Sequence, residues 1–102
     1  MNWKISRIKS FYDNGYDNTA IMLKGLIDGI IKRGNTENVK LIDIIKETIK
    51  DFNSTKRLIR KELKDNEKLK NEYILFTNKL ILMLKKELKI YEKLEYKYDV
   101  KN

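Results

Sequence analysis

The sequence contains no cysteine and no histidine among its 102 residues. Without cysteine the chain can form no disulfide, no thiolate nucleophile and no cysteine-ligated zinc site. Without histidine it lacks the side chain that most often serves as a general base and as a ligand of transition metals. Few enzymes work without either residue type. We therefore expect a non-enzymatic protein with no catalytic residue, no metal site, no cofactor and no small-molecule substrate.

Proline is also absent, and only four glycines occur, so few positions interrupt a helix. Apolar residues recur at intervals of three and four along every long segment, and no segment alternates with a period of two, which predicts an all-α protein. Hydrophobic residues make up 41% of the chain and charged residues 37%. This balance is typical of amphipathic helices, and the length favours a single helical domain over residues 1–102.

No apolar segment reaches the roughly 20 residues that a membrane-spanning helix needs. The most apolar one, residues 73–84, is interrupted by Asn78 and Lys79. Near the start of the sequence, Lys4 and Arg7 stand where a secretion signal would need an apolar core. The sequence therefore predicts no membrane partner and a cytoplasmic protein.

Two short helices are predicted in the first third of the chain. Apolar spacing favours the first over residues 2–12, ended by the turn signal of residues 13–15. Asn18 or Thr19 is expected to cap the second helix, which would extend to Arg33, with Gly34 at its C-terminal end.

Apolar residues occupy most of the circumference of this second helix, so we expect it to lie at the centre of the fold. Gly25 and Gly29 are one turn apart within it. Because glycine has no side chain, this pair predicts a close approach by another backbone.

Two long apolar stripes follow. Thr36 is expected to cap the first long helix, and its stripe contains Ile42, Ile45, Ile49, Phe52, Ile59 and Leu63. The same spacing resumes after two polar positions, at Tyr73, Leu80, Leu84, Tyr91, Leu94 and Tyr98.

The dipeptide Asp65-Asn66 favours a reversal between the two stripes, and a single continuous rod is the alternative. With the reversal, the fold is an all-α, small helical bundle with two short N-terminal helices and a long C-terminal helical hairpin. A last helix over residues 66–99 would be about 50 Å long. The short helices could not cover it, so we expect a homo-oligomer, at least a dimer. Its interface would contain Leu80, Leu84, Tyr91 and Leu94.

Four basic residues fall at i, i+3, i+4 and i+7 and so lie on one helical face: Arg57, Arg60, Lys61 and Lys64. We call these residues the basic ridge. Such a ridge can bind the phosphates of a nucleic acid or the acidic surface of a protein. A solvated helix face is the plainer interpretation, because Lys and Arg number 23 in the whole chain against 15 Asp and Glu.

Three acids on the same helix, Asp43, Glu47 and Asp51, are spaced at i, i+4 and i+8. Carboxylate metal sites on helices use a similar spacing, but they also use histidine, which is absent. Because Lys46 and Lys50 stand close to these acids in the sequence, we favour ion pairing at the surface.

Together these features predict a non-enzymatic binding or regulatory protein that self-associates and presents the basic ridge to nucleic acid or to another anionic partner. Two alternatives stay open. One is a small inhibitor or adaptor, possibly virus- or plasmid-encoded, that binds a protein of a nucleic-acid-handling complex. The other is a helical structural subunit of a larger assembly. No motif in the sequence distinguishes these three functions or identifies a family.

Overall fold

The computed structural model describes residues 2–32 and 38–101, and within them the side chains of residues 2–29 and 41–93. Within this part the chain contains no strand and forms four helices: α1 (Trp3–Asn14), α2 (Tyr16–Lys32), α3 (Asn38–Glu62) and α4 (Glu67–Lys101). The prediction of an all-α protein is confirmed. None of the described helices is both long and apolar enough to cross a membrane. The predicted helix ends at Gly34 and Thr36 lie outside the described residues.

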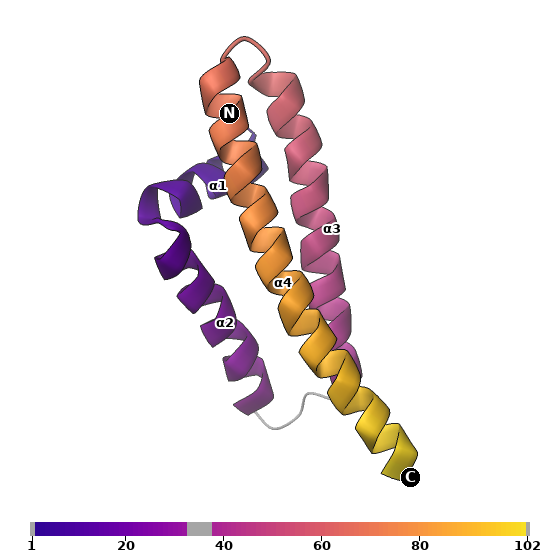
Figure 1. Ribbon diagram of the computed structural model, residues 1–102. Helices are drawn as coiled ribbons and strands as arrows, with labels where there is room; N and C mark the ends of the chain where they lie inside the picture. Colours follow the sequence, from indigo (N-terminus) through magenta and orange to yellow (C-terminus); the bar gives the residue numbers. More distant parts are fainter. Residues whose placement is uncertain (1, 33–37, 102) are drawn as a thin grey trace.

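The two long helices, α3 and α4, lie side by side and run in opposite directions (Figure 1). They give the molecule its elongated shape, with extents of 55 × 21 × 19 Å. The chain turns between Glu62 and Glu67, where the Asn66 amide N–H donates a 3.0 Å hydrogen bond to the Leu63 carbonyl. The Asn66 side chain then accepts a 3.2 Å hydrogen bond from the Leu69 N–H, as an N-cap does.

The hydrophobic core lies mainly between α3 and α4, and α1 and α2 cover it on one side. Each helix contributes apolar side chains at helical spacing. Because this spacing places them on one face of the helix, that face packs against the core. The side chains with less than 2% exposure include Ile5 and Ile8 of α1, Leu41, Ile45, Phe52 and Ile59 of α3, and Leu80 of α4.

Helices α1 and α2 meet at a sharp corner formed by Gly15. Its φ of 94° is in the region that residues with a side chain rarely adopt. The Gly15 N–H reaches the carbonyls of Phe11 and Tyr12, at 3.1 and 3.2 Å, and closes α1. The turn predicted at residues 13–15 is confirmed.

The prediction that Asn18 or Thr19 caps α2 is wrong, because α2 begins earlier, at Tyr16. Both side chains instead serve the end of α1. The Asn18 side-chain amide donates to the Asn14 carbonyl at 2.9 Å, and the Thr19 hydroxyl donates to the Phe11 carbonyl at 3.0 Å. These bonds place side-chain donors on carbonyls at the end of α1, where the Phe11 carbonyl also accepts from the Gly15 N–H.

The prediction that α2 lies at the centre of the fold is also wrong. Ile21 is 69% exposed and Leu26 57%, and Ile27 is the only apolar side chain of α2 that is buried among those described. The physical reason is that α3 and α4 bury most of their apolar surface on each other, so α2 packs along their side. A Cβ added at Gly25 would have no described atom within 4 Å, so the predicted close backbone approach does not occur there.

Candidate anion-binding groove

The basic ridge predicted from the sequence lies at the end of α3 and in the turn that follows. Arg57, Arg60, Lys61 and Lys64 are all exposed. No ion pair joins any of the four to another described side chain. Their charges are therefore available to an anion in solution.

Two ridge residues, Arg57 and Arg60, line a groove of about 590 Å³ along α3. Lys61 and Lys64 do not line it. The other lining residues are Lys46, Ile49, Lys50, Asn53, Ser54 and Lys56. We call this feature the basic groove. Five of its eight residues are cationic and none is acidic, so it concentrates positive charge in a concave surface.

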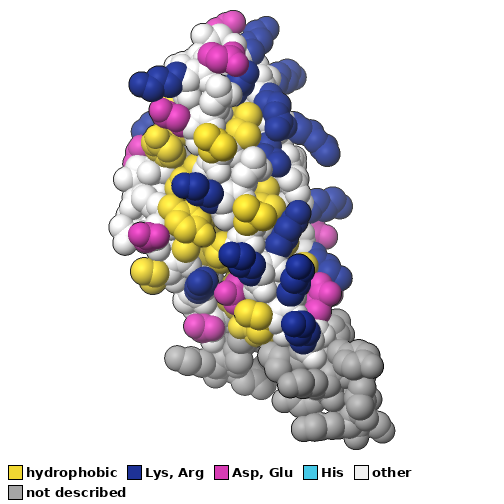
Figure 2. Space-filling model, in the orientation of Figure 1, with side chains coloured by type: hydrophobic (Ala, Val, Ile, Leu, Met, Phe, Trp, Pro, Cys, Tyr) yellow, Lys and Arg dark blue, Asp and Glu magenta, His cyan; other side chains and the backbone are white. Residues whose placement is uncertain are grey.

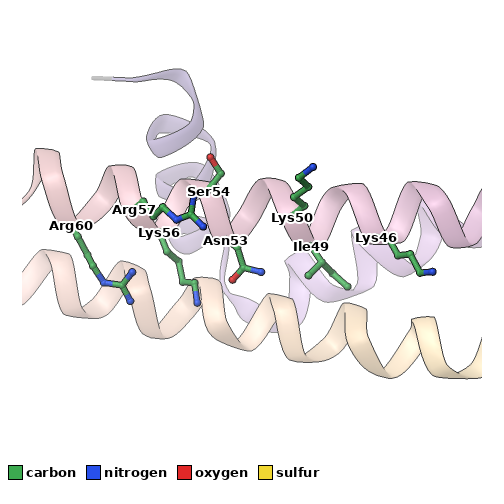
Figure 3. Close-up of a pocket in the computed structure, with 8 residues that line it drawn as sticks. All are labelled: Lys46, Ile49, Lys50, Asn53, Ser54, Lys56, Arg57 and Arg60. Atoms are coloured by element: carbon green, nitrogen blue, oxygen red, sulfur yellow. The ribbon is translucent and has the colours of Figure 1, made fainter.

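The cations of the basic groove lie on both of its sides. Lys46, Lys56 and Arg60 extend from α3 toward α4, whereas Lys50 extends away from α4 (Figure 3). The first and last of these cations are fourteen residues apart, or about 21 Å along the helix. The groove therefore fits an extended anion better than a small one.

One cation is held in place by the neighbouring helix. The Lys56 ammonium donates a 2.8 Å hydrogen bond to the side-chain oxygen of Asn78 on α4, and Lys56 is half-buried. Because the acceptor is a neutral amide, the bond orients the ammonium without neutralising its charge. Lys56 is the one groove cation for which α4 supplies such a contact among the described residues.

Sequence reasoning missed three of the five cations of the groove, namely Lys46, Lys50 and Lys56. The first two are one turn apart, and Lys50 and Arg57 are two turns apart, so the helical spacing could have revealed a longer basic face. Lys46 and Lys50 were instead expected to pair with the acids of α3. No such ion pair occurs among the described side chains.

Of the three acids Asp43, Glu47 and Asp51, the one that forms ion pairs among the described side chains is Asp51, and its partners are on α1. Its carboxylate lies 3.0 Å from the Lys4 ammonium and accepts a 2.6 Å hydrogen bond from Arg7. Partial burial acts to raise the pKa of Asp51, but the hydrogen bonds from Arg7 and Lys4 outweigh it and lower that pKa below 3.8. The expected pairing with Lys46 and Lys50 is thus corrected.

The other two acids, Asp43 and Glu47, share a cleft of about 480 Å³ with Arg7, Asp51 and two uncharged residues. The described residues contain no cluster of carboxylates arranged to hold a metal ion. Helix α3 therefore carries a cationic groove on one side and an acidic cleft on the side that meets α1.

The stripe predicted as an oligomer interface is buried inside a single chain. Leu80 is 0% exposed, Leu84 2% and Tyr91 9%. Burial also raises the pKa of Tyr91, helped by the nearby carboxylates of Glu87 and Asp28. These three residues are therefore covered within one chain, whereas Leu75, Leu82 and Ile90 on other positions of α4 stay exposed.

Leu94, the fourth residue of that predicted interface, has a side chain outside the described part. Self-association itself stays a prediction, but Leu80, Leu84 and Tyr91 are not available for it. Any contact between copies has to use other surfaces.

Comparisons with known proteins add no relative. No family model matches the chain, and no curated protein and no solved structure matches it.

Proposed function

We propose that this chain is a non-catalytic binding protein that holds the phosphate backbone of a nucleic acid along the basic groove of α3. The observation that supports this most directly is the lining of the groove, with five cations and no carboxylate over about 21 Å of helix. A polyanion releases counterions when such cations neutralise its phosphates, and this release drives binding.

The remaining groove residues fit the same chemistry. The Asn53 amide and the Ser54 hydroxyl are neutral donors of the kind that contact phosphate oxygens. The groove has no aromatic residue on which a base could stack. We therefore expect contacts to the backbone with little preference for sequence.

Two further parts of the proposal come from the sequence. The protein is expected to act in the cytoplasm, and to self-associate through surfaces other than the buried stripe of α4. A basic protein that forms assemblies would bind a polyanion at several places at once, which raises the overall affinity.

The test measures binding of a fluorescent DNA and a fluorescent RNA at several salt concentrations. The variant carries Lys50→Glu and Arg57→Glu, two exposed groove positions. The control variant carries Lys24→Glu and Lys85→Glu, which change the net charge equally but are exposed positions outside the groove.

We expect the wild-type protein to bind more weakly as salt rises, and the groove variant to lose binding while its helicity is retained. The control variant should bind with a much smaller loss. Equal loss in both variants would show that only net charge matters. Absence of binding to DNA and RNA even at low salt would contradict the proposal.

A second pair of ridge residues, one inside the groove and one outside it, permits a separate measurement. Arg60→Glu with Lys64→Glu changes one cation that lines the groove and one that does not, and it should weaken binding less than the groove variant does. If nucleic acid does not bind but the groove variant fails to copurify with a native protein partner, then an acidic protein surface is the ligand.

A second candidate, a protein-binding inhibitor or adaptor, is favoured by one observation. Ile21 and Met22 of α2 are 69% and 40% exposed, which is unusual for adjacent large apolar residues. A change of both to serine should abolish binding to a target protein and leave binding of nucleic acid unchanged.

A further inference from the structure

An apolar groove of about 320 Å³ lies beside α2, on the side of the bundle formed with α3. We call it the α2–α3 groove. Leu84 of α4 lies among its lining residues, and Leu26 and Ile44 border it while remaining 57% and 45% exposed. Exposed leucine and isoleucine around a preformed hollow are typical of a surface that binds another protein.

Acidic residues adjoin this groove. Ile44 and Thr48 line both the α2–α3 groove and the acidic cleft, so the two hollows are next to each other. Asp43 and Glu47 of the cleft are exposed, and neither forms an ion pair with another described side chain. A complementary partner therefore has apolar side chains flanked by lysine or arginine.

The chain itself carries such a surface on α4. Leu75, Lys79, Leu82 and Lys86 follow at i, i+4, i+7 and i+11 and so form one row along the helix, which we call the outer row. Leu75 is 64% exposed and Leu82 59%, and both lysines are exposed. Hydrophobic and basic side chains alternate over α4 on the face drawn in Figure 2.

We propose that the outer row of one copy docks in the α2–α3 groove of a second copy. Leu75 and Leu82 then cover Leu26 and Ile44, and the two lysines of the row face the carboxylates of the cleft. This inference rests on the self-association in the proposed function, and it names the surfaces that make the contact.

The two surfaces lie on opposite sides of α4. Leu84 lines the α2–α3 groove from inside the bundle, whereas Leu82 is two residues earlier and so about 200° around the helix. A two-fold dimer repeats one patch on both copies, but here two different patches meet. A pair joined by one such contact therefore keeps one free groove on one copy and one free row on the other, and association continues beyond the dimer in a head-to-tail manner.

The first experiment follows molecular mass by sedimentation as protein concentration is raised, without nucleic acid. Asp43→Lys with Glu47→Lys reverses the two exposed acids of the cleft, and Lys79→Glu with Lys86→Glu reverses the outer row. Each variant should lose the rise in mass that the wild type shows. The variant with Lys50→Glu and Arg57→Glu serves as the control and should associate like the wild type.

The second experiment mixes the two defective variants in equal amounts. Each altered surface repels the normal surface of its partner. In the mixture, however, the unaltered outer row of the first variant can dock in the unaltered groove of the second. The altered cleft of the first variant is basic and the altered row of the second is acidic, so these two surfaces also attract each other. The mixture should therefore regain association, and a chain with all four reversals should self-associate as well.

Circular dichroism of each variant checks that the helices are intact, because the Lys79 ammonium lies 5.9 Å from the centre of the Tyr16 ring. A wild type that stays monomeric at every concentration overturns the inference. Association that both reversals leave unchanged overturns it too, as does a mixture that stays monomeric. Failure of nucleic-acid binding is measured separately and leaves these results unaffected.

Discussion

Arg7 on α1 donates a 2.6 Å hydrogen bond to the Asp51 carboxylate on α3. The guanidinium lies between two aromatic rings, 4.9 Å from the centre of Phe52 and 5.4 Å from that of Trp3. Lys4 completes the cluster at 3.0 Å from Asp51. This cluster attaches the short first helix to the long helical pair at a point where burial is incomplete.

The first prediction concerns the pH dependence of this contact. The pKa of Asp51 is lowered below 3.8 in the folded protein, so its contribution to stability is fully present above 3.8 and is lost as the pH falls through the folded pKa. Asp51→Asn should therefore reduce the free energy of unfolding by about 1 kcal/mol at neutral pH. Urea denaturation of the variant and the wild type measures this difference.

The difference between the two proteins should shrink in acid solution, well below pH 3.8. A loss of equal size at neutral and acid pH would show that the carboxylate charge does not stabilise the contact.

The second prediction compares two glycines. Gly15 has φ 94° and ψ 152°, a conformation that is strained for any residue with a Cβ. Gly15→Ala should destabilise the protein by about 1–3 kcal/mol. Gly25→Ala should stabilise it by about 0.5–1 kcal/mol, because Gly25 is inside α2 and the added Cβ meets no described atom within 4 Å. Thermal denaturation of the two variants should shift in opposite directions.

The sequence predicted the long helices better than the position of the short ones. The spacing of Ile45, Phe52 and Ile59 identified the buried face of α3, and these residues are 0–1% exposed. Periodicity could not show how far α2 would be covered, because an apolar face looks the same in sequence whether or not another helix packs on it. Leu26 and Ile27 are adjacent and similar, yet one is 57% exposed and the other 6%.

The candidate site was predictable only in part, for a similar reason. Arg57 and Arg60 are close in sequence and share a face, so local spacing located them. The contact between Lys56 and Asn78 joins residues 22 positions apart on two helices. Such a contact depends on how α3 and α4 pack together, and no local pattern indicates it.

The third prediction tests that contact through nucleic-acid binding. Asn78→Asp places a carboxylate against the Lys56 ammonium and neutralises one of the five cations of the basic groove. Binding should weaken, and the slope of log affinity against log salt should fall by about one. Asn78→Ala serves as the control, because it removes the hydrogen bond but leaves the charge, and its salt slope should match that of the wild type. Identical slopes for all three proteins would exclude Lys56 from the contact with phosphate.

The last prediction uses two leucines of α4 to distinguish a residue of the core from a residue that contacts another copy of the chain. Leu84 is 2% exposed and Leu82 59%, although only one residue separates them. Leu84→Ala removes packed methyl groups and should lower the free energy of unfolding by about 2–5 kcal/mol. Leu82→Ala removes none from the core and should change it by less than about 0.5 kcal/mol.

Both variants are measured at low protein concentration, where copies of the chain are dissociated. Under these conditions an interface residue contributes nothing, because dissociated copies make no contact, whereas a core residue contributes in full. If Leu84→Ala destabilises the protein only at high concentration, Leu84 belongs to an interface and its burial in one chain is contradicted. If Leu82→Ala leaves stability unchanged but weakens association at high concentration, the outer row of α4 is a contact between copies.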